Sequence, residues 1–214
     1  YDYLLIATGL RCAYEDVPGL GPDQGHTQWI GTVDEAEPAY ADFRKLLANP
    51  GPVVIGAVQF ASCFGPAYEY AAILDTALRR HRVRDRVPIT FVTSEPYLGH
   101  LGIAGVGDSK GMMEHEFRNR HVKWIANARV TKIEPGKLFA EELDAKGQLA
   151  QQHEIAFAHA MMVPAFKGVA AVAAVEGLVN PRGLVIVDEH QRATTYPNIY
   201  AAGACVALTP VEAT

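Results

Sequence analysis

The sequence of 214 residues has little cysteine, no excess of positive charge and no long uninterrupted apolar segment. Its three cysteines, Cys12, Cys63 and Cys205, are too few and too scattered for a disulfide scaffold. Nineteen Lys and Arg against 24 Asp and Glu give a net charge of −5, the wrong sign for a surface that binds nucleic acid. The longest apolar stretch, residues 155–179, is interrupted by His, Pro, Lys and Glu, whereas a membrane span needs about 20 nearly uninterrupted apolar residues. These features argue against a disulfide scaffold, a nucleic-acid-binding protein and a membrane-spanning segment.

The rest of the composition is typical of a folded globular protein. Hydrophobic residues make up 49% of the chain and charged residues 20%, which leaves enough apolar surface for a core. A length of 214 residues allows one or two domains. Because the chain opens on a strand-like run without an initiator methionine and stops without a tail, we expect it to be a piece of a longer protein.

Helix-like and strand-like segments alternate along the first part of the chain. Apolar residues at helical spacing predict helices over residues 32–48 and 67–82. Asp108 and Ser109 are suited to cap a third helix. Between the helices we expect continuous apolar strands of the kind buried on both faces of a parallel sheet, at residues 52–56, 87–93 and 122–125.

Shorter runs separated by turn residues follow, and they predict an antiparallel meander. The fold class predicted from this order is α/β: a Rossmann-like, three-layer unit with right-handed crossovers and an appended antiparallel β-meander. The meander strands are expected at residues 128–133, 137–143 and 155–163, and further short strands at 3–7, 184–187 and 198–202.

The loop after residues 52–56 is the first candidate site, because ligands of α/β sheets bind outside the carboxyl ends of the strands. Compared with the dinucleotide-binding fingerprint G-x-G-x-x-G, the loop has Gly56 at the first position but Val58 at the second and Ala61 at the third. A side chain at the second position obstructs the approach of a pyrophosphate to the backbone. The sequence therefore predicts the strand-turn-helix frame without the glycines that bind a nucleotide.

Cys63 lies in the same loop, close to the start of the helix expected over residues 67–82. The partial positive charge at a helix N-terminus favours the thiolate, which is the nucleophilic form of cysteine. A free cysteine is more often a small buried hydrophobic residue, and we expect that role for Cys12 and Cys205. Glu69, about one and a half turns further on, either exchanges a proton with the thiol or is a first-turn acid that suits the helix dipole.

Several segments carry a resemblance to a known family, over nearly the whole chain. The N-terminal YDYLLIATG, residues 1–9, resembles the strand that closes the FAD domain of flavoprotein reductases with two dinucleotide domains. The other segments resemble the second domain of sulfide:quinone oxidoreductases, and the one around Cys63 is the most specific. They are GPVVIG at 51–56, ASCFGPAYE at 61–69, TSEPYLGHLG at 93–102 and VDEHQR at 187–192.

The resemblance implies an enzyme that oxidises sulfide to polysulfide or sulfur and passes the electrons through FAD to a membrane quinone. In such enzymes a cysteine matching Cys63 carries sulfur beside the flavin, and its redox partner is a cysteine of the C-terminal region, expected beyond Thr214. The family usually has another cysteine where this sequence has Gly31, so this chain departs from a three-cysteine mechanism. A flavocytochrome c-type sulfide dehydrogenase and a non-catalytic sulfur-carrier module are the alternatives.

The resemblance also implies roles for particular residues. Glu69 and His100 are expected to act beside the catalytic Cys63, Glu69 as a proton handler and His100 in proton handling or substrate contact. The alternative for His100, which follows a strand in a glycine-rich loop, is a histidine hydrogen-bonded to backbone. The FAD contacts expected within this chain are Ala7, Thr8, Gly9 and Gly203.

The implied domain organisation is the end of an FAD domain at residues 1–9, an NAD-like second domain at 10–162 and a return to the FAD domain at 163–214. Ala204 stands where related flavoproteins commonly have the Asp that holds the ribityl chain. For this reason, and because the FAD-binding G-x-G-x-x-G is not in the sequence, the chain alone is expected to be inactive and without FAD. The resemblance implies that membrane anchoring belongs to a C-terminal region beyond this sequence, so the chain alone is expected to be soluble. The full enzyme is expected at the surface of the bacterial cytoplasmic membrane, with homo-oligomerisation left open.

Other residues do not predict a metal site. His115 and His121 are six residues apart, about 600° around a helix, whereas the zinc-protease motif needs a spacing of four. Asp188 and Glu189 are equally well explained by a turn. Lys167 is either solvated or, where the chain returns to the FAD domain, close to the flavin.

Overall fold

The computed structural model describes residues 2–208. They form two compact units, one of residues 14–165 and a smaller one that joins residues 2–13 to residues 166–208. Each unit has its own sheets and its own apolar core. Within residues 2–208, no helix combines the length and the hydropathy needed to cross a membrane.

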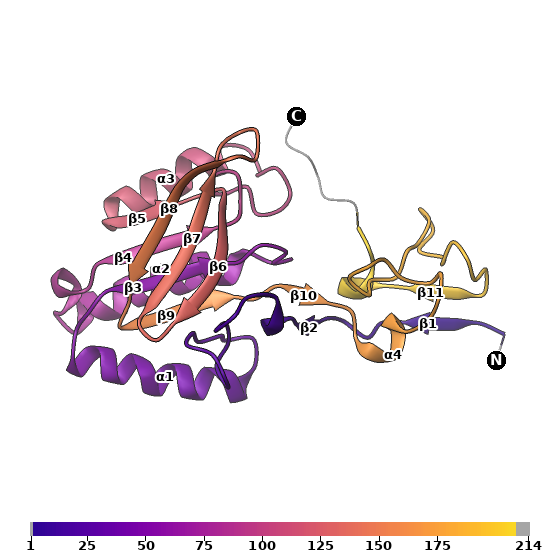
Figure 1. The fold of residues 1–214 in the computed structure, drawn as a ribbon, viewed down its shortest axis with the longest axis horizontal. Coiled ribbons are helices and arrows are strands. Elements are labelled where there is room, and N and C mark those ends of the chain that lie inside the picture. Colours follow the sequence, from indigo (N-terminus) through magenta and orange to yellow (C-terminus); the bar gives the residue numbers. More distant parts are fainter. Residues whose placement is uncertain (1, 209–214) are drawn as a thin grey trace. The chain divides into compact units, whose positions relative to one another are not determined.

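The larger unit is built on a four-stranded parallel sheet in the order β5-β4-β3-β9 (Figure 1). Every residue of β3 and of β9 is buried, as expected for strands covered on both faces. The strands predicted over 52–56, 87–93 and 122–125 are confirmed to within two residues. The sheet consists of β3 (Val53–Ala57), β4 (Ile89–Thr93), β5 (Val122–Ile125) and β9 (His159–Val163).

Three helices accompany this sheet, at the predicted places. They are α1 (Val33–Ala48), α2 (Gly65–Arg80) and α3 (Ser109–Asn119). The side chains of Thr32 and Asp108 accept backbone N–H groups in the first turns of α1 and α3. Capping of this kind satisfies amide groups that have no partner inside the helix, which explains where these two helices begin.

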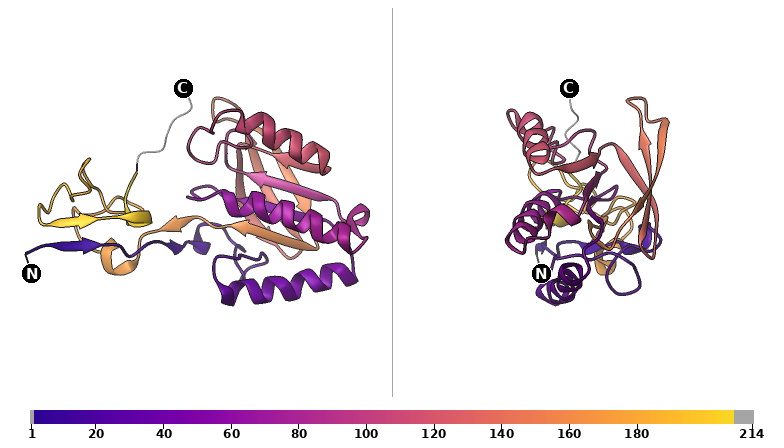
Figure 2. Two further views of the ribbon diagram at one scale, coloured as in Figure 1. Left: turned by 180° about the vertical axis from the view of Figure 1, so that it is seen from behind. Right: turned by 90° about the vertical axis from the view of Figure 1, so that its left-hand side faces the viewer.

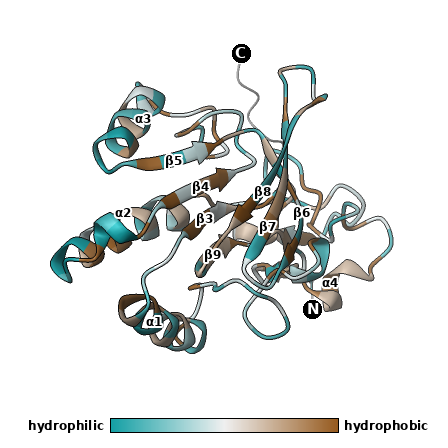
Figure 3. Ribbon diagram, turned by 60° about the vertical axis from the view of Figure 1, so that its left-hand side comes forward, coloured by the Kyte–Doolittle hydropathy of each residue, from teal (hydrophilic) through white to brown (hydrophobic). Residues whose placement is uncertain are grey.

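The larger unit has three layers. Figure 2 shows α2 and α3 on one face of the parallel sheet and an antiparallel sheet on the other. In Figure 3 the strands β3 and β4 are mostly hydrophobic, whereas α3 is largely hydrophilic. The predicted three-layer α/β architecture with an appended meander is confirmed.

The meander consists of β6 (Ala128–Glu134), β7 (Lys137–Leu143) and β8 (Leu149–Ala156) in the order β6-β7-β8. The prediction of one meander strand over residues 155–163 is wrong. The chain turns near residue 157, and the part beyond it is β9, which pairs in parallel with β3. The reason is burial: β8 is polar and mostly exposed, whereas all of β9 is buried between the layers.

A chain of polar groups joins α1 and α2 to the amino end of β9. Nδ1 of His159, the first residue of β9, lies 2.9 Å from Oδ2 of Asp42, and its Nε2 lies 2.7 Å from the hydroxyl of Tyr70. The hydrogen bond with His159 is the main cause that lowers the pKa of Asp42 below its ordinary value. This network lies at the end of the sheet opposite to the carboxyl ends of the strands.

The smaller unit contains two short sheets. In one, β1 (Leu4–Ile6) pairs in parallel with β11 (Ile199–Ala201). In the other, β2 (Arg11–Cys12) pairs antiparallel with β10 (Phe166–Lys167), which is followed by α4 (Ala170–Ala173).

The strand predicted over residues 184–187 is wrong, because this segment makes only isolated bridges at Val185 and Val187. The unit is closed by the short helix η3 (Gly203–Cys205). Its core is formed by Ile6, Val172, Leu178, Val185, Ala193, Ala201, Cys205 and Val206.

Candidate functional site

Two loops lie at the carboxyl edge of the parallel sheet. The Cys63 loop, residues 58–64, leads from β3 to α2, and the His100 loop, residues 94–108, leads from β4 to α3. Because β3 and β4 are neighbouring parallel strands, both loops leave the same edge of the sheet.

The two loops are in contact at two points. The hydroxyl of Ser94 donates a hydrogen bond to the carbonyl oxygen of Val58 at 3.1 Å. A Cβ placed on Gly102 would lie 3.4 Å from the ring of Phe64. The middle of the His100 loop therefore lies against the residue that follows Cys63, and the structure brings these two predicted segments together.

Cys63 is exposed and forms no disulfide. It lies two residues before the first residue of α2, whose N-cap residue Phe64 makes no side-chain capping bond. The positive end of the helix dipole therefore lies near this sulfur, although Pro66 carries no N–H and the N–H of Ala67 donates to the carbonyl oxygen of Phe64. Cys205 is buried as expected, with its Sγ 3.2 Å from a carbonyl oxygen, whereas Cys12 is only half-buried.

Glu69 is exposed on α2, at the fifth position of the helix. The interpretation of Glu69 as a first-turn acid is wrong, since the first turn of α2 contains no acidic residue. The reason is that α2 begins at Gly65, two residues earlier than predicted, which places Glu69 in the second turn. Its carboxylate is open to solvent on the same helix that begins beside Cys63.

His100 is half-buried in its loop. Its Nδ1 accepts the backbone N–H of Gly102 at 3.2 Å, which leaves the ring proton of the neutral imidazole on Nε2. Its ring meets that of Tyr97 edge to face, with the centroids 5.2 Å apart. The histidine is thus hydrogen-bonded to backbone and still retains a second ring nitrogen for exchange of a proton.

Sequence reasoning missed the buried charged residue of the His100 loop, Glu95, which has 2% of its surface exposed. It accepts hydrogen bonds from Thr93, Tyr68 and the backbone N–H of Leu101. Burial raises the pKa of the Glu95 carboxyl above its ordinary value, and the three hydrogen bonds act in the opposite direction. The available signal was a charged residue directly behind a buried strand, where a carboxylate needs a specific set of partners.

The structure changes the interpretation of the damaged nucleotide fingerprint. Gly56 lies within β3, where a Cβ would come within 1.8 Å of the carbonyl oxygen of Val92, so strand packing requires this glycine. The side chain of Val58 is fully buried and therefore does not obstruct the surface itself. Phe60, with 65% of its surface exposed, is the large apolar residue that the loop presents to solvent.

The residues predicted to contact FAD lie in the smaller unit. Gly9 and Gly203 follow the parallel strands β1 and β11, with φ of +68° and +81°, and a Cβ on either would meet no atom within 4 Å. Ala7 and Thr8 are exposed beside Gly9. Open backbone at the carboxyl ends of two parallel strands fits the close approach of a cofactor such as FAD.

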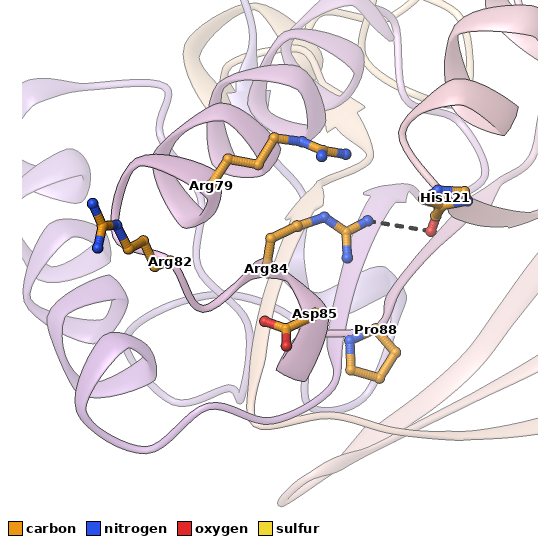
Figure 4. Close-up of a pocket in the computed structure, with 6 residues that line it drawn as sticks. All are labelled: Arg79, Arg82, Arg84, Asp85, Pro88 and His121. Atoms are coloured by element: carbon orange, nitrogen blue, oxygen red, sulfur yellow. Dashed lines mark hydrogen bonds between the residues drawn. The ribbon is translucent and has the colours of Figure 1, made fainter.

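A cavity of about 630 Å³ lies elsewhere in the larger unit (Figure 4). It is at the amino ends of the strands, since Pro88 precedes β4 and His121 precedes β5. The guanidinium groups of Arg79 and Arg84 are already paired with the buried Asp75. This cavity is therefore separate from the Cys63 edge. The described residues contain no cluster of three or more His, Cys, Asp or Glu side chains placed to hold a metal ion.

The fold defines the class of protein. Over residues 1–214 the chain matches the pyridine nucleotide-disulphide oxidoreductase family, and it belongs to this family. The Rossmann-like fold class predicted from the sequence agrees with this assignment.

Within that class, the chain is 41% identical over its whole length to the sulfide-quinone reductase of Aquifex aeolicus, of which it covers 48%. It matches the X-ray structure of the sulfide:quinone oxidoreductase from that bacterium with a TM-score of 0.88 and 42% identity, over 99% of this chain and 48% of that one. The resemblance stated from the sequence is confirmed.

More distant structures share the fold. NDH2 from Plasmodium falciparum in complex with NADH matches with a TM-score of 0.71 at 15% identity, over 96% of this chain and 44% of that one. The chain spans about half the length of these relatives.

Proposed function

We propose that this chain forms the thiol-bearing part of an FAD-dependent sulfide:quinone oxidoreductase, which works where quinone is available at a membrane surface. The observation that carries the proposal is the exposed Cys63 at the carboxyl edge of the sheet, in a chain 41% identical to the Aquifex sulfide-quinone reductase. In this assignment residues 10–162 are the NAD-like second domain, and residues 1–9 and 163–214 belong to the FAD domain. The division of the described residues near 13/14 and 165/166 supports these boundaries.

The proposed reaction begins with attack of HS⁻ on a sulfur that bridges Cys63 and the cysteine expected in the C-terminal region beyond Thr214. A new S–S bond forms, the bond from that sulfur to one cysteine breaks, and this cysteine leaves as a thiolate with the electron pair. The thiolate then forms a bond to the added sulfur. This step restores the bridge and releases two electrons and the proton of HS⁻. The two electrons, with two protons, convert quinone to quinol, and the sulfur leaves as polysulfide or sulfur.

Three residues of this chain are assigned roles in the reaction. Cys63 holds the sulfur, because a nucleophilic thiol has to be reachable from solvent and close to positive charge. Glu69, exposed in the second turn of α2, accepts the proton released from HS⁻. His100 exchanges a proton through Nε2, since its Nδ1 is occupied by the Gly102 amide.

FAD, when bound, supplies the two-electron acceptor between sulfide and quinone. Ala7, Thr8, Gly9 and Gly203 hold it in this proposal by backbone contact, which the open surroundings of both glycines permit. The exposed Phe60 in the Cys63 loop makes this edge unsuited to a nicotinamide cofactor.

The test is sulfide-dependent bleaching of flavin absorbance, measured on the FAD-loaded protein as its gene encodes it. Cys63→Ser should lower the bleaching rate by about 10³-fold or more, because removing the nucleophile removes the covalent route. Cys12→Ser is the matched control and should bleach like the wild type. An unchanged bleaching rate in Cys63→Ser would show that Cys63 takes no part in the reaction, and the proposal would then be wrong.

A further inference from the structure

The backbone on both sides of His100 is tied to one buried group of side chains. The N–H of Leu101 donates to Oε1 of Glu95 at 2.7 Å. The N–H of Gly99 donates to the hydroxyl of Tyr68 at 2.9 Å, and that hydroxyl in turn donates to Oε2 of Glu95 at 2.8 Å. His100 is therefore flanked by two amides that both depend on Glu95.

The same carboxylate reaches three elements. Thr93, the last residue of β4, donates its hydroxyl to Oε2 of Glu95 at 2.7 Å. Tyr68 lies in the first turn of α2, next to Glu69 and five residues beyond Cys63. The end of β4, the start of α2 and the His100 loop thus meet at one side chain.

The donors around Glu95 are themselves held rigidly. The ring of Tyr68 packs against Phe91 and Phe117, with centroids 4.7 Å and 5.7 Å away. Gly99 has a φ of +80°, and a Cβ there would lie 2.6 Å from the carbonyl oxygen of Ser109, so the loop backbone has little freedom to shift. Burial and the neighbouring Glu95 charge raise the pKa of Tyr68, which keeps it a neutral hydroxyl donor.

We propose that Glu95 is a positioning residue: its buried carboxylate holds the His100 loop against the first turn of α2 and so sets where His100 stands relative to the Cys63 loop. The inference rests on the proposed function only for the role of His100 in the reaction. The anchoring itself is a property of this chain, and three donors converging on one buried carboxylate are charge-assisted hydrogen bonds of the stronger kind.

The first test measures backbone amide hydrogen exchange in Glu95→Gln, using the FAD-loaded protein as its gene encodes it. The amide keeps the size of the side chain but puts an NH₂ group among three donors, so exchange at Leu101 and Gly99 should accelerate about tenfold or more. Exchange within β3 should stay unchanged and shows that the fold is intact. Unchanged exchange at Leu101 and Gly99 would overturn the anchoring.

If Glu95→Gln folds poorly, a second variant and a control variant test the same anchoring. Tyr68→Phe removes the acceptor of the Gly99 amide and one donor to Glu95, but it keeps the bond of the Leu101 amide to Oε1 of Glu95, so it should accelerate exchange at Gly99 more than at Leu101. Glu134→Gln, at an exposed ion pair on β6, is the matched control and should change neither amide. Equal exchange in Tyr68→Phe and wild type at Gly99 would also contradict the proposal.

The second test separates positioning of His100 from general damage to the enzyme. Glu95→Gln should slow sulfide-dependent flavin bleaching about tenfold in the wild-type background and have little effect in a His100→Ala background, because the positioned group is then absent. An equal fold loss in both backgrounds would overturn the role through His100. If the wild-type protein itself fails to bleach with sulfide, the proposed function fails while the exchange test of Glu95 remains decisive.

Discussion

At the scale of single residues, Gly31 is the position where this chain departs from the cysteine pattern of the family it resembles. A Cβ built on Gly31 would lie 2.2 Å from Nε1 and 2.7 Å from Cε2 of the Trp29 indole. Trp29 is buried, with 6% of its surface exposed. The space beside Gly31 is therefore filled by a core side chain, and a cysteine there requires the indole to move.

We therefore expect Gly31→Ala and Gly31→Cys to lower the free energy of unfolding by about 1–3 kcal/mol, the usual cost of overpacking. Urea denaturation followed by tryptophan fluorescence measures this loss. Gly65→Ala is the control, since a Cβ there meets no atom within 4 Å and the backbone is not in the left-handed region. If Gly31→Cys and wild type have the same free energy of unfolding, the Trp29 indole moves without loss of stability and the explanation is wrong.

At the scale of elements, one buried carboxylate joins two helices and the short helix η2 (Arg84–Arg86). Asp75 of α2 pairs with Arg79 of α2, with Arg84 of η2 and with Arg120 at the end of α3. Burial alone would raise the pKa of Asp75, but the hydrogen bonds and charges of Arg79 and Arg84 outweigh it and hold this pKa below its ordinary value. The network fixes the amino edge of the sheet, opposite to the Cys63 loop.

Asp75→Asn should destabilise the protein by about 3–5 kcal/mol, because it removes the carboxylate that pairs with Arg84, the most buried of the three arginines, whose side chain is 13% exposed. Since the folded pKa of Asp75 is lowered, its contribution is present above its ordinary value of 3.8 and is lost as the pH falls below it. Urea unfolding from pH 6 to pH 3 should show a shallower acid-induced decline in Asp75→Asn than in wild type. The exposed Asp85→Asn is the control, and parallel pH profiles for wild type and Asp75→Asn would contradict this explanation.

At the scale of the whole molecule, the larger unit is continuous in sequence whereas the smaller one is assembled from two distant segments. The larger unit has its own parallel sheet, its own helices and a core that includes β3, β4 and β9. Its last strand, β9, supplies the partner of β3 on one side. Residues 14–165 thus contain a complete sheet and core, and this core requires the final strand, β9.

A protein of residues 14–165 should fold cooperatively and keep Cys63 reactive toward a thiol reagent, because its core is complete. A protein of residues 14–157 should not, since removal of β9 uncovers the edge and apolar surface of β3. Thermal unfolding followed by circular dichroism distinguishes the two. Loss of a cooperative transition in residues 14–165 would mean that the smaller unit is required for this core.

Local pattern was sufficient for most elements of this protein. The caps at Thr32 and Asp108 and the apolar spacing of the helices are properties of neighbouring residues, so the positions of α1, α2 and α3 followed from the sequence. The strand at 122–125 is likewise a short apolar run between turns. The family resemblance was carried by short segments whose residues are adjacent in sequence, above all the one around Cys63.

Other features depend on contacts between distant segments, and only the tertiary structure decided them. Residues 155–163 contain the end of β8 and all of β9, because one part lies in the exposed meander and the other is buried against β3, which no local pattern distinguishes. In the sequence Glu95 cannot be distinguished from a solvent-exposed loop residue. The fold brings Tyr68 and the backbone N–H of Leu101 to its carboxylate as hydrogen-bond donors. The sequence by itself thus determined the helices, most of the strands and which cysteine is the candidate nucleophile, whereas burial, set by long-range packing, decided which carboxylate accepts the hydrogen bonds of Thr93, Tyr68 and Leu101.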